Sequence, residues 1–202
     1  MPKRLGRRFY RRPADELART LLGCRMVRRL KDGTRLSGVI IEVEAYLGIQ
    51  DQAAHTFGGR RTPRNEAMWG DGGLGYVYFT YGMHHCFNIV AQRIDQPEAV
   101  LVRALEPSKG LEAMRERRPK AKRDTDLCSG PAKLCAAMAI DRSLNAEDLV
   151  TSDRLWLETA QKVTDDQVVR TPRIGIDYAG DWVDRPLRFC VRGHPHLSRS
   201  TP

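Results

Sequence analysis

The sequence lacks several features by which common classes of protein are recognised. Its apolar runs fall well short of the roughly 20 residues that a helix needs to cross a bilayer, and no apolar signal-peptide core follows Arg12. The five cysteines are odd in number and form no C-x-x-C pair, so neither a disulfide framework nor a zinc module is predicted. We therefore expect an intracellular protein, in the cytoplasm or nucleoid if bacterial, with no membrane contact and no bound metal.

Several catalytic motifs are also missing. No lysine occurs between Asp32 and Ser108, so this stretch offers no amine for a Schiff base. Neither a P-loop nor a G-x-S-x-G nucleophile elbow occurs. The stretch is instead rich in aromatic, acidic and arginine side chains. This set suits hydrolysis at a nucleotide with water as the nucleophile.

Positive charge is what the sequence has in excess. The 202 residues carry a formal net charge of +9, with a pI near 9.6, and much of it falls in four clusters at 3–12, 25–31, 60–64 and 115–123. Scattered basic clusters favour a polyanionic partner such as nucleic acid, although a solvated basic face is the simpler alternative. The first cluster predicts a basic N-terminal arm over residues 1–12, and we expect a flexible tail over residues 194–202.

The pattern of apolar residues predicts one mixed α+β domain over residues 1–202, because no internal repeat and no linker interrupts it. Residues 48–75 are rich in glycine, and a loop of this length is usually functional or disordered. The expected helices cover Pro13–Gly23, Ser108–Arg118 and a segment capped by Ser129; the expected strands cover Cys24–Leu30, Arg35–Leu47, Leu74–Thr80, His85–Ala91, Val100–Leu105, Arg154–Glu158, Arg173–Tyr178 and Leu187–Arg192.

The stretch VIIEVEAYL, residues 39–47, places two carboxylates in an otherwise apolar strand. Side chains alternate between the faces of a strand, so Glu42 and Glu44 share a face with Tyr46. One interpretation is a half-exposed strand with a polar outer side. The other is catalytic, because the strand leads into the long glycine-rich loop, where a carboxylate is well placed to act as a general base.

The stretch YVYFTYGMHHCFN, residues 76–88, predicts a hairpin with bulky side chains at its tip. Tyr81 and Met83 crowd the turn at Gly82, where few neighbours are available for packing. Either the tip folds back on the core, or it acts as a wedge between DNA bases, a known role of apolar side chains that enter the minor groove. The stretch alone leaves both interpretations open.

Arg103 lies inside an apolar strand, AVLVRALEP. A buried arginine needs a partner, because an unpaired buried charge is costly. Glu42 and Glu44 are the candidates. The pair is either a structural salt bridge or an arrangement in which Arg103 helps Glu44 to hold a water molecule.

A series of short motifs runs in order from about Pro13 to Gly193. They are EVEAYLG at 42–48, AAH at 53–55, GGR at 58–60, TPRN at 62–65, YVY at 76–78 with YGM at 81–83, RALEP at 103–107, SGP at 129–131 with KLC at 133–135, and PLRFCVRG at 186–193. Together they resemble the alkyladenine DNA glycosylases, also called 3-methyladenine or methylpurine DNA glycosylases.

The resemblance implies a fold and an activity. The expected fold is a curved antiparallel β-sheet with flanking helices and a protruding, DNA-intercalating β-hairpin. The expected activity is that of a monomeric, monofunctional glycosylase that needs no cofactor and acts in base excision repair. Such an enzyme flips a damaged purine (3-methyladenine, 7-methylguanine, hypoxanthine or ethenoadenine) out of double-stranded DNA and hydrolyses its N-glycosidic bond, leaving an abasic site.

The resemblance also implies roles for individual residues. Glu44 is expected to activate the attacking water, with help from Arg103 and from a backbone group near Ile174-Gly175. The flipped base is expected to lie between Tyr46, His55 and Tyr78, with Leu101 also lining its site and Asn88 screening out normal guanine. The residues expected to contact DNA are Tyr81, which would fill the gap left in the duplex, Met83, Arg60 and Arg64.

Two alternatives belong to other functional classes. A non-catalytic nucleic-acid-binding module would explain the basic clusters and aromatic residues without any reaction. A metal-dependent nuclease would use Glu42, Glu44 and Asp51 to hold Mg²⁺ and would cut strands only when metal is present. The first predicts tight binding with no base release.

Overall fold

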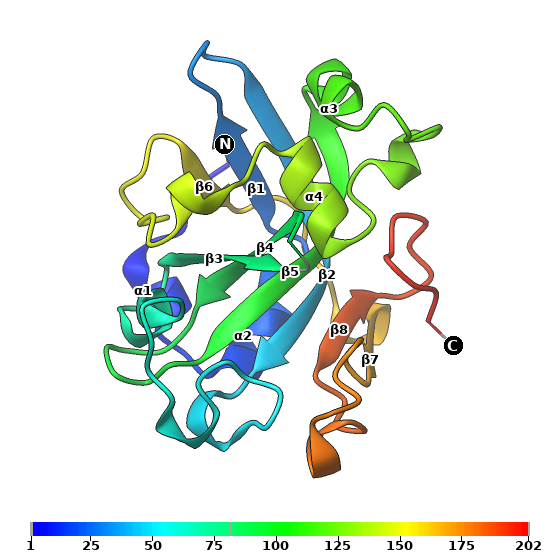
Figure 1. Ribbon diagram of the computed structural model, residues 1–202. Helices are drawn as coiled ribbons and strands as arrows, with labels where there is room; N and C mark the ends of the chain where they lie inside the picture. Colours follow the sequence, from blue (N-terminus) through cyan, green and yellow to red (C-terminus); the bar gives the residue numbers. More distant parts are fainter. Residues whose placement is uncertain (1, 81, 202) are drawn as a thin grey trace.

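The computed structural model describes residues 2–80 and 82–201 (Figure 1). A curved sheet of eight strands dominates the described part of the chain, and every strand pairing in it is antiparallel. The strands are β1 (Arg25–Arg29), β2 (Arg35–Tyr46), β3 (Gly75–Thr80), β4 (His84–Val90), β5 (Ala99–Lys109), β6 (Leu155–Glu158), β7 (Val168–Thr171) and β8 (Arg188–Val191); the helices are α1 (Arg7–Tyr10), α2 (Ala14–Leu21), α3 (Leu111–Arg117) and α4 (Pro131–Ala137). The predicted α+β class and curved antiparallel sheet are confirmed.

Strand β2 is the centre of the sheet. It pairs with β5 along one edge, and with β1 and then β8 along the other, so that the strand order β3-β4-β5-β2-β1-β6 carries β8 and β7 as a branch. The pairing with β5 shifts register on both sides of Glu42, which marks a β-bulge there. Bulges bend a strand and increase its twist. This bulge lies where the neighbour of β2 changes from β1 to β8.

Both faces of β2 are buried, which rules out the half-exposed strand. Every residue from Leu36 to Ala45 is buried. Helix α2 packs on the strand and contributes Leu17 and Leu21 to the core. On the other face, Glu42 and Glu44 are fully inaccessible to solvent. Two carboxylates at such depth require charged or hydrogen-bonding partners, and these partners define the candidate site.

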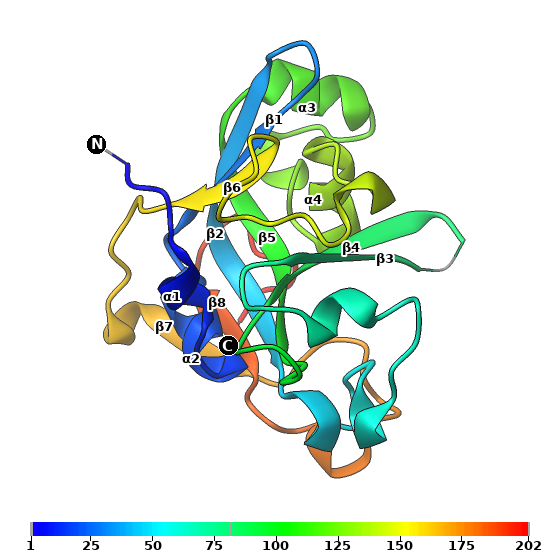
Figure 2. The same cartoon turned by 90° about the vertical axis from the view of Figure 1, so that its left-hand side faces the viewer.

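The hairpin of β3 and β4 projects from the body of the molecule, as expected (Figure 2). Its base is held by α4, which packs on β4. Toward the tip the side chains become exposed, including Phe79 and Met83. Gly82 adopts the left-handed conformation, with φ of 67°, that a tight turn requires.

The long loop after β2 contains three short 3₁₀ turns, η1 (Gly48–Gln50), η2 (Phe57–Gly59) and η3 (Glu66–Trp69). Asp51 fastens its beginning, because its buried carboxylate accepts hydrogen bonds from the backbone of Leu47 and Ala53. The loop is therefore ordered around a buried charge and lies beside the pocket described below.

Three local predictions are wrong. Residues 173–178 form bends and a turn instead of a strand, because the backbone N–H of Ile174 donates to Glu44 and not to a neighbouring strand. Ser108 belongs to β5, where its hydroxyl bonds Ser37, and α3 begins after Gly110. Ser129 does not cap α4, whose N-cap is Gly130.

Both terminal segments make defined contacts with the body. In the basic arm, Tyr10 is fully buried and Arg11 forms a two-bond ion pair with Asp71. In the segment expected to be a flexible tail, the backbone N–H and hydroxyl of Ser198 both donate to Glu42. Among the described residues, no helix is both long and apolar enough to cross a membrane.

Candidate active site

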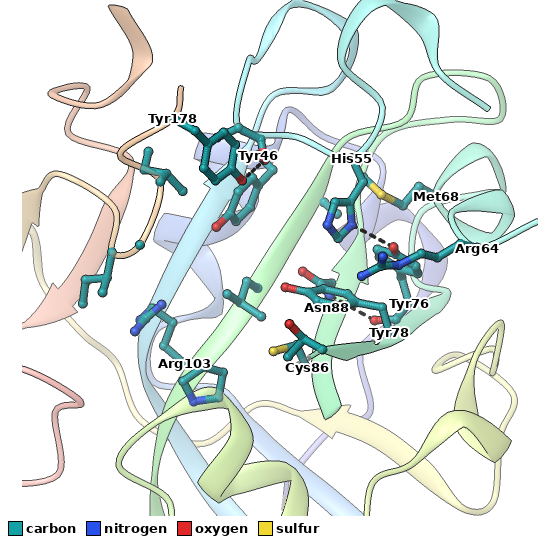
Figure 3. A pocket seen from close by; sticks show the side chains of 18 residues that line it. Tyr46, His55, Arg64, Met68, Tyr76, Tyr78, Cys86, Asn88, Arg103 and Tyr178 are labelled. Atoms are coloured by element: carbon teal, nitrogen blue, oxygen red, sulfur yellow. Dashed lines mark hydrogen bonds between the residues drawn. The ribbon is translucent and has the colours of Figure 1, made fainter. Parts of the chain in front are cut away.

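A pocket of about 250 Å³ opens between the sheet and the long loop (Figure 3). Its walls come from β2, β3, β4, β5, the loop after β2 and residues 174–178. In Figure 3, Tyr46 and Tyr178 lie on one side of the pocket, and His55, Tyr76 and Tyr78 lie on the other. The sequence therefore folds so that aromatic side chains from four separate segments face one space.

Glu44 lies directly behind this pocket. Its Oε1 accepts a 2.8 Å hydrogen bond from the backbone N–H of Ile174 and lies 3.2 Å from Nη1 of Arg103. Its Oε2 accepts a 3.0 Å hydrogen bond from the hydroxyl of Tyr46. All three partners line the pocket, whereas Glu44 itself is fully buried. The carboxylate is thus held in a fixed orientation against three residues that line the pocket.

Arg103 bridges the two buried glutamates, as the sequence predicts. Its Nε donates to Glu42 at 3.0 Å, while Nη1 faces Glu44. Arg188 adds a second cation, with its Nε 2.8 Å from Glu42. Two carboxylates and two guanidinium groups leave this cluster without net charge. Burial opposes charge on Arg103, but Glu44 and Glu42 outweigh that effect and raise its pKa, so Arg103 stays protonated.

Tyr46 is clamped between charged groups and the pocket. The guanidinium carbon of Arg173 lies 4.7 Å from the centre of its ring, within the range of a cation–π contact. Arg173 is fixed in turn by a buried, two-bond ion pair with Asp51, with distances of 2.5 and 2.8 Å, and by a bond to the carbonyl of Ala45. Arg173 therefore holds the Tyr46 ring in one position, which suits stacking.

His55 and Tyr78 form the opposite wall. Their rings pack edge to face with centroids 4.7 Å apart. Nδ1 of His55 lies 2.8 Å from the hydroxyl of Tyr76, which fixes the orientation of the imidazole. Burial, followed by the charges of Arg64 and Arg60, lowers the pKa of His55 to about 4. The ring is therefore neutral at pH 7, which suits stacking better than proton donation.

Asn88 and Leu101 complete the inner wall. They pair across β4 and β5, and both are almost fully buried and line the pocket. Nδ2 of Asn88 donates to the carbonyl of Tyr76 at 3.1 Å, which holds the amide in one orientation. The pocket thus combines two aromatic walls with one fixed amide and a buried carboxylate–arginine pair.

Comparison with known proteins identifies the family. Residues 8–195 match the methylpurine-DNA glycosylase family. The chain belongs to that family. The DNA-3-methyladenine glycosylase of Mus musculus is 48% identical over 96% of this chain and 61% of its own length, and that of Homo sapiens is 47% identical over 96% and 68%. A relative from Desulfitobacterium hafniense is 44% identical over 97% of this chain and 98% of its own. The chain thus spans about three fifths of the mouse protein and nearly all of the last one.

The structure brings together most of the residues that the resemblance to methylpurine-DNA glycosylases singled out. Tyr46, His55, Tyr78, Asn88, Leu101, Arg103 and Arg64 all line the pocket. Arg64 lies with its guanidinium carbon 5.4 Å from the ring centre of Tyr78. Arg60 lines an adjoining recess of about 300 Å³, and Met83 lies at the exposed hairpin tip. Tyr81 lies outside the described residues.

Sequence reasoning missed three contributors to this site. Tyr76 has a recognisable signal, because it alternates with Tyr78 along one strand and so reaches the same face. No sequence signal points to Arg173. It lies in a predicted strand, and its partner Asp51 was considered only as a metal ligand. Tyr178 lines both the pocket and the adjoining recess, in a segment where a strand was expected.

The carboxylates proposed for a metal-dependent nuclease do not converge. Glu42 bonds Arg103 and Arg188, whereas Asp51 bonds Arg173. Within residues 2–80 and 82–201, no three His, Cys, Asp or Glu side chains are grouped as potential metal ligands. In this member of the methylpurine-DNA glycosylase family, these carboxylates are partners of arginines.

Proposed function

We propose that the protein is a monofunctional DNA glycosylase that flips a damaged purine out of double-stranded DNA and hydrolyses its N-glycosidic bond. The observation that carries this proposal is the position of Glu44, fully buried and bonded to Tyr46, Arg103 and Ile174 behind an aromatic pocket. The relatives from mouse and human are named DNA-3-methyladenine glycosylases, which agrees with it. Family membership alone would not assign a role to any residue here.

The proposed reaction uses water as nucleophile. A water molecule placed between Glu44 and the sugar loses a proton to the carboxylate as its oxygen bonds to C1′. The bond between C1′ and the purine nitrogen breaks, and the base leaves with the electron pair. A cationic base, such as 3-methyladenine in DNA, leaves as a neutral molecule and needs no acid. A neutral base, such as hypoxanthine, leaves as an anion and takes up a proton from solvent once the bond is broken. Arg103 holds Glu44 and the water in place, and the carboxylate stabilises the positive charge that develops on the sugar.

Binding energy supports the flip. Extruding a base costs a few kcal/mol and is easiest for damaged or mismatched bases. Stacking returns about 1–3 kcal/mol per base, and the walls formed by Tyr46 on one side and His55 with Tyr78 on the other supply it. Asn88, held by the Tyr76 carbonyl, would crowd the exocyclic amine of normal guanine. 7-Methylguanine carries the same amine, but as a cationic base it is a much better leaving group. We propose 3-methyladenine, 7-methylguanine, hypoxanthine and ethenoadenine as the substrate range.

The partner is proposed to be double-stranded DNA, bound by a monomer. Arg64 lines the pocket, Arg60 and Arg64 both line the adjoining recess, and both are exposed, so a phosphate backbone could contact them. Met83 is 68% exposed at the tip of the projecting hairpin, an unfavourable position for a methionine unless another surface covers it. Insertion of this tip into the duplex would cover it and fill the space that the flipped base leaves.

A substrate panel tests the function. Duplexes with one 3-methyladenine, 7-methylguanine, hypoxanthine or ethenoadenine are incubated with the protein in EDTA, and a duplex with adenine at that position is the matched control. The proposal predicts free base and an alkali-labile abasic site from damaged duplexes, with no strand break before alkali. Tight binding without base release from any duplex would indicate a binding module and would overturn the proposal.

A further inference from the structure

Glu42 does not line the pocket, yet its carboxylate accepts four hydrogen bonds. Oε1 accepts from Nε of Arg188 at 2.8 Å, Nε of Arg103 at 3.0 Å and the hydroxyl of Ser198 at 2.6 Å. Oε2 accepts from the backbone N–H of Ser198 at 2.6 Å. Half of these bonds come from a single residue near the end of the chain.

The same residue also contacts Arg103. Nη2 of Arg103 lies 3.4 Å from the hydroxyl oxygen of Ser198, while its Nε and Nη1 face Glu42 and Glu44 respectively. A guanidinium group is planar and rigid, so contacts at all three of its nitrogens fix the direction in which Nη1 points. Ser198 thus contacts both Arg103 and the carboxylate that anchors it.

The C-terminal segment is itself held in place. Arg188 donates through Nη2 to the carbonyl of Arg199 at 2.8 Å and through Nη1 to the hydroxyl of Thr171 at 3.1 Å. The segment is therefore held beside β8 and contacts the Glu42 cluster through Ser198 and Arg199. The figure of the whole chain shows the C-terminal segment beside β8 (Figure 1).

We propose that Ser198 is a positioning residue, which holds Glu42 and Arg103 so that Nη1 of Arg103 stays directed at Glu44. This inference rests on the proposed role of Glu44 as the general base. The C-terminal segment would then affect the reaction rate through Ser198. Glu42 would anchor Arg103 and would not act as a second general base.

The charges around Glu42 explain why its anchoring depends on Ser198. Burial alone would raise the pKa of Glu42, but the hydrogen bonds from Ser198 and then Arg188 outweigh burial and hold the pKa below its usual value. The charged groups facing the carboxylate are Arg103 on β5 and Arg188 on β8, with Glu44 on the same strand. Without the hydroxyl of Ser198, the carboxylate loses one donor, and Arg103 loses the contact at Nη2.

Three variants separate positioning from folding. Ser198→Ala removes the hydroxyl but keeps the backbone N–H. Ser198→Thr restores a hydroxyl at the same atom position. Ser200→Ala, at an exposed serine two residues further on, is the matched control. For each variant, the single-turnover rate constant on a hypoxanthine duplex, the Kd for a duplex with a non-cleavable abasic-site analogue and the melting temperature are measured.

A second measurement does not depend on activity. The Nε–H signal of Arg103, assigned by ¹⁵N NMR, reports directly on the bond between Arg103 and Glu42. In the wild type this proton is expected to exchange slowly with solvent, because Arg103 is almost fully buried and its Nε–H is bonded. In Ser198→Ala, the proton is expected to exchange faster, while in Ser200→Ala it does not change.

The proposal predicts that Ser198→Ala lowers the single-turnover rate about 10- to 100-fold, the range expected for a misplaced catalytic group, with Kd within twofold of wild type. Ser198→Thr should recover most of the rate, and Ser200→Ala should match wild type. A Ser198→Ala rate equal to wild type, or a loss explained entirely by weaker DNA binding, would overturn it. If wild type releases no base but its Arg103 signal responds to Ser198→Ala, the proposed function fails while the positioning contact stands.

Discussion

The hydroxyl of Tyr46 donates a 3.0 Å hydrogen bond to Oε2 of Glu44, so that one side chain serves as both a wall of the pocket and a partner of the buried carboxylate. Burial and then the charge of Glu44 raise the pKa of Tyr46 well above its usual value, which keeps the hydroxyl protonated as a donor at all pH values of interest. In the proposed reaction, Tyr46 would therefore both stack on the flipped purine and orient the carboxylate of Glu44.

Two substitutions at Tyr46 separate these functions. Tyr46→Phe keeps the ring and removes a hydrogen bond worth about 0.5–1.5 kcal/mol, so the single-turnover rate on a hypoxanthine duplex is expected to fall about 3- to 10-fold. Tyr46→Ala also removes stacking worth about 1–3 kcal/mol, so a further loss of about 5- to 150-fold is expected. Equal losses in both variants would show that the ring does not stack on the base.

The buried pair of Asp51 and Arg173 predicts a large effect on stability. Both side chains are completely buried, and the pair also anchors the loop after β2. Asp51→Asn leaves an uncompensated buried guanidinium, so the free energy of unfolding in urea is expected to fall by about 3–5 kcal/mol. Asp124→Asn is the matched control, because the Arg115–Asp124 pair is exposed and such pairs contribute at most about 1 kcal/mol. Similar losses in the two variants would contradict this account.

Much of the fold could be predicted because its signals are local. The alternation of apolar residues in β2, the glycine at the hairpin turn and the proline before α2 each act within a few residues. The convergence of Glu42 and Glu44 on Arg103 could also be predicted, because a buried arginine on one strand requires a carboxylate on its neighbour.

The remainder of the site depends on contacts between distant parts of the chain. Arg173 meets Asp51 across 122 residues, and Ser198 meets Glu42 across 156. No periodic pattern encodes such pairs. Such long-range contacts also override local preference. Residues 173–178 have the alternating pattern of a strand, but they form no strand, and the backbone N–H of Ile174 bonds Glu44 instead.

The environment of His55 predicts how stability changes with pH. Its pKa is about 4 in the folded protein, against a usual value of 6.5, because burial and neighbouring arginines disfavour the charged ring. The unfolded chain therefore binds more protons than the folded one between pH 4 and 6.5, and stability is lost as pH falls through this window. The contribution of one such group is at most ~1.4 kcal/mol per pH unit.

His55→Gln should remove this contribution. The free energy of unfolding of the wild type, measured in urea at several pH values from 7 down to 4.5, is expected to fall more steeply than that of the variant. Identical slopes for wild type and His55→Gln would mean that His55 is not held neutral by the fold.

The central claim is that Glu44 activates the attacking water, and Glu44→Gln tests it most directly. The measurement is the single-turnover rate of base release from a hypoxanthine duplex in EDTA, with the Kd for an abasic-site analogue measured alongside. A positioned general base contributes about 10²–10⁴-fold, so a loss of that size is predicted, with Kd within a few fold of wild type. Release of the base by Glu44→Gln at the wild-type rate would contradict the account.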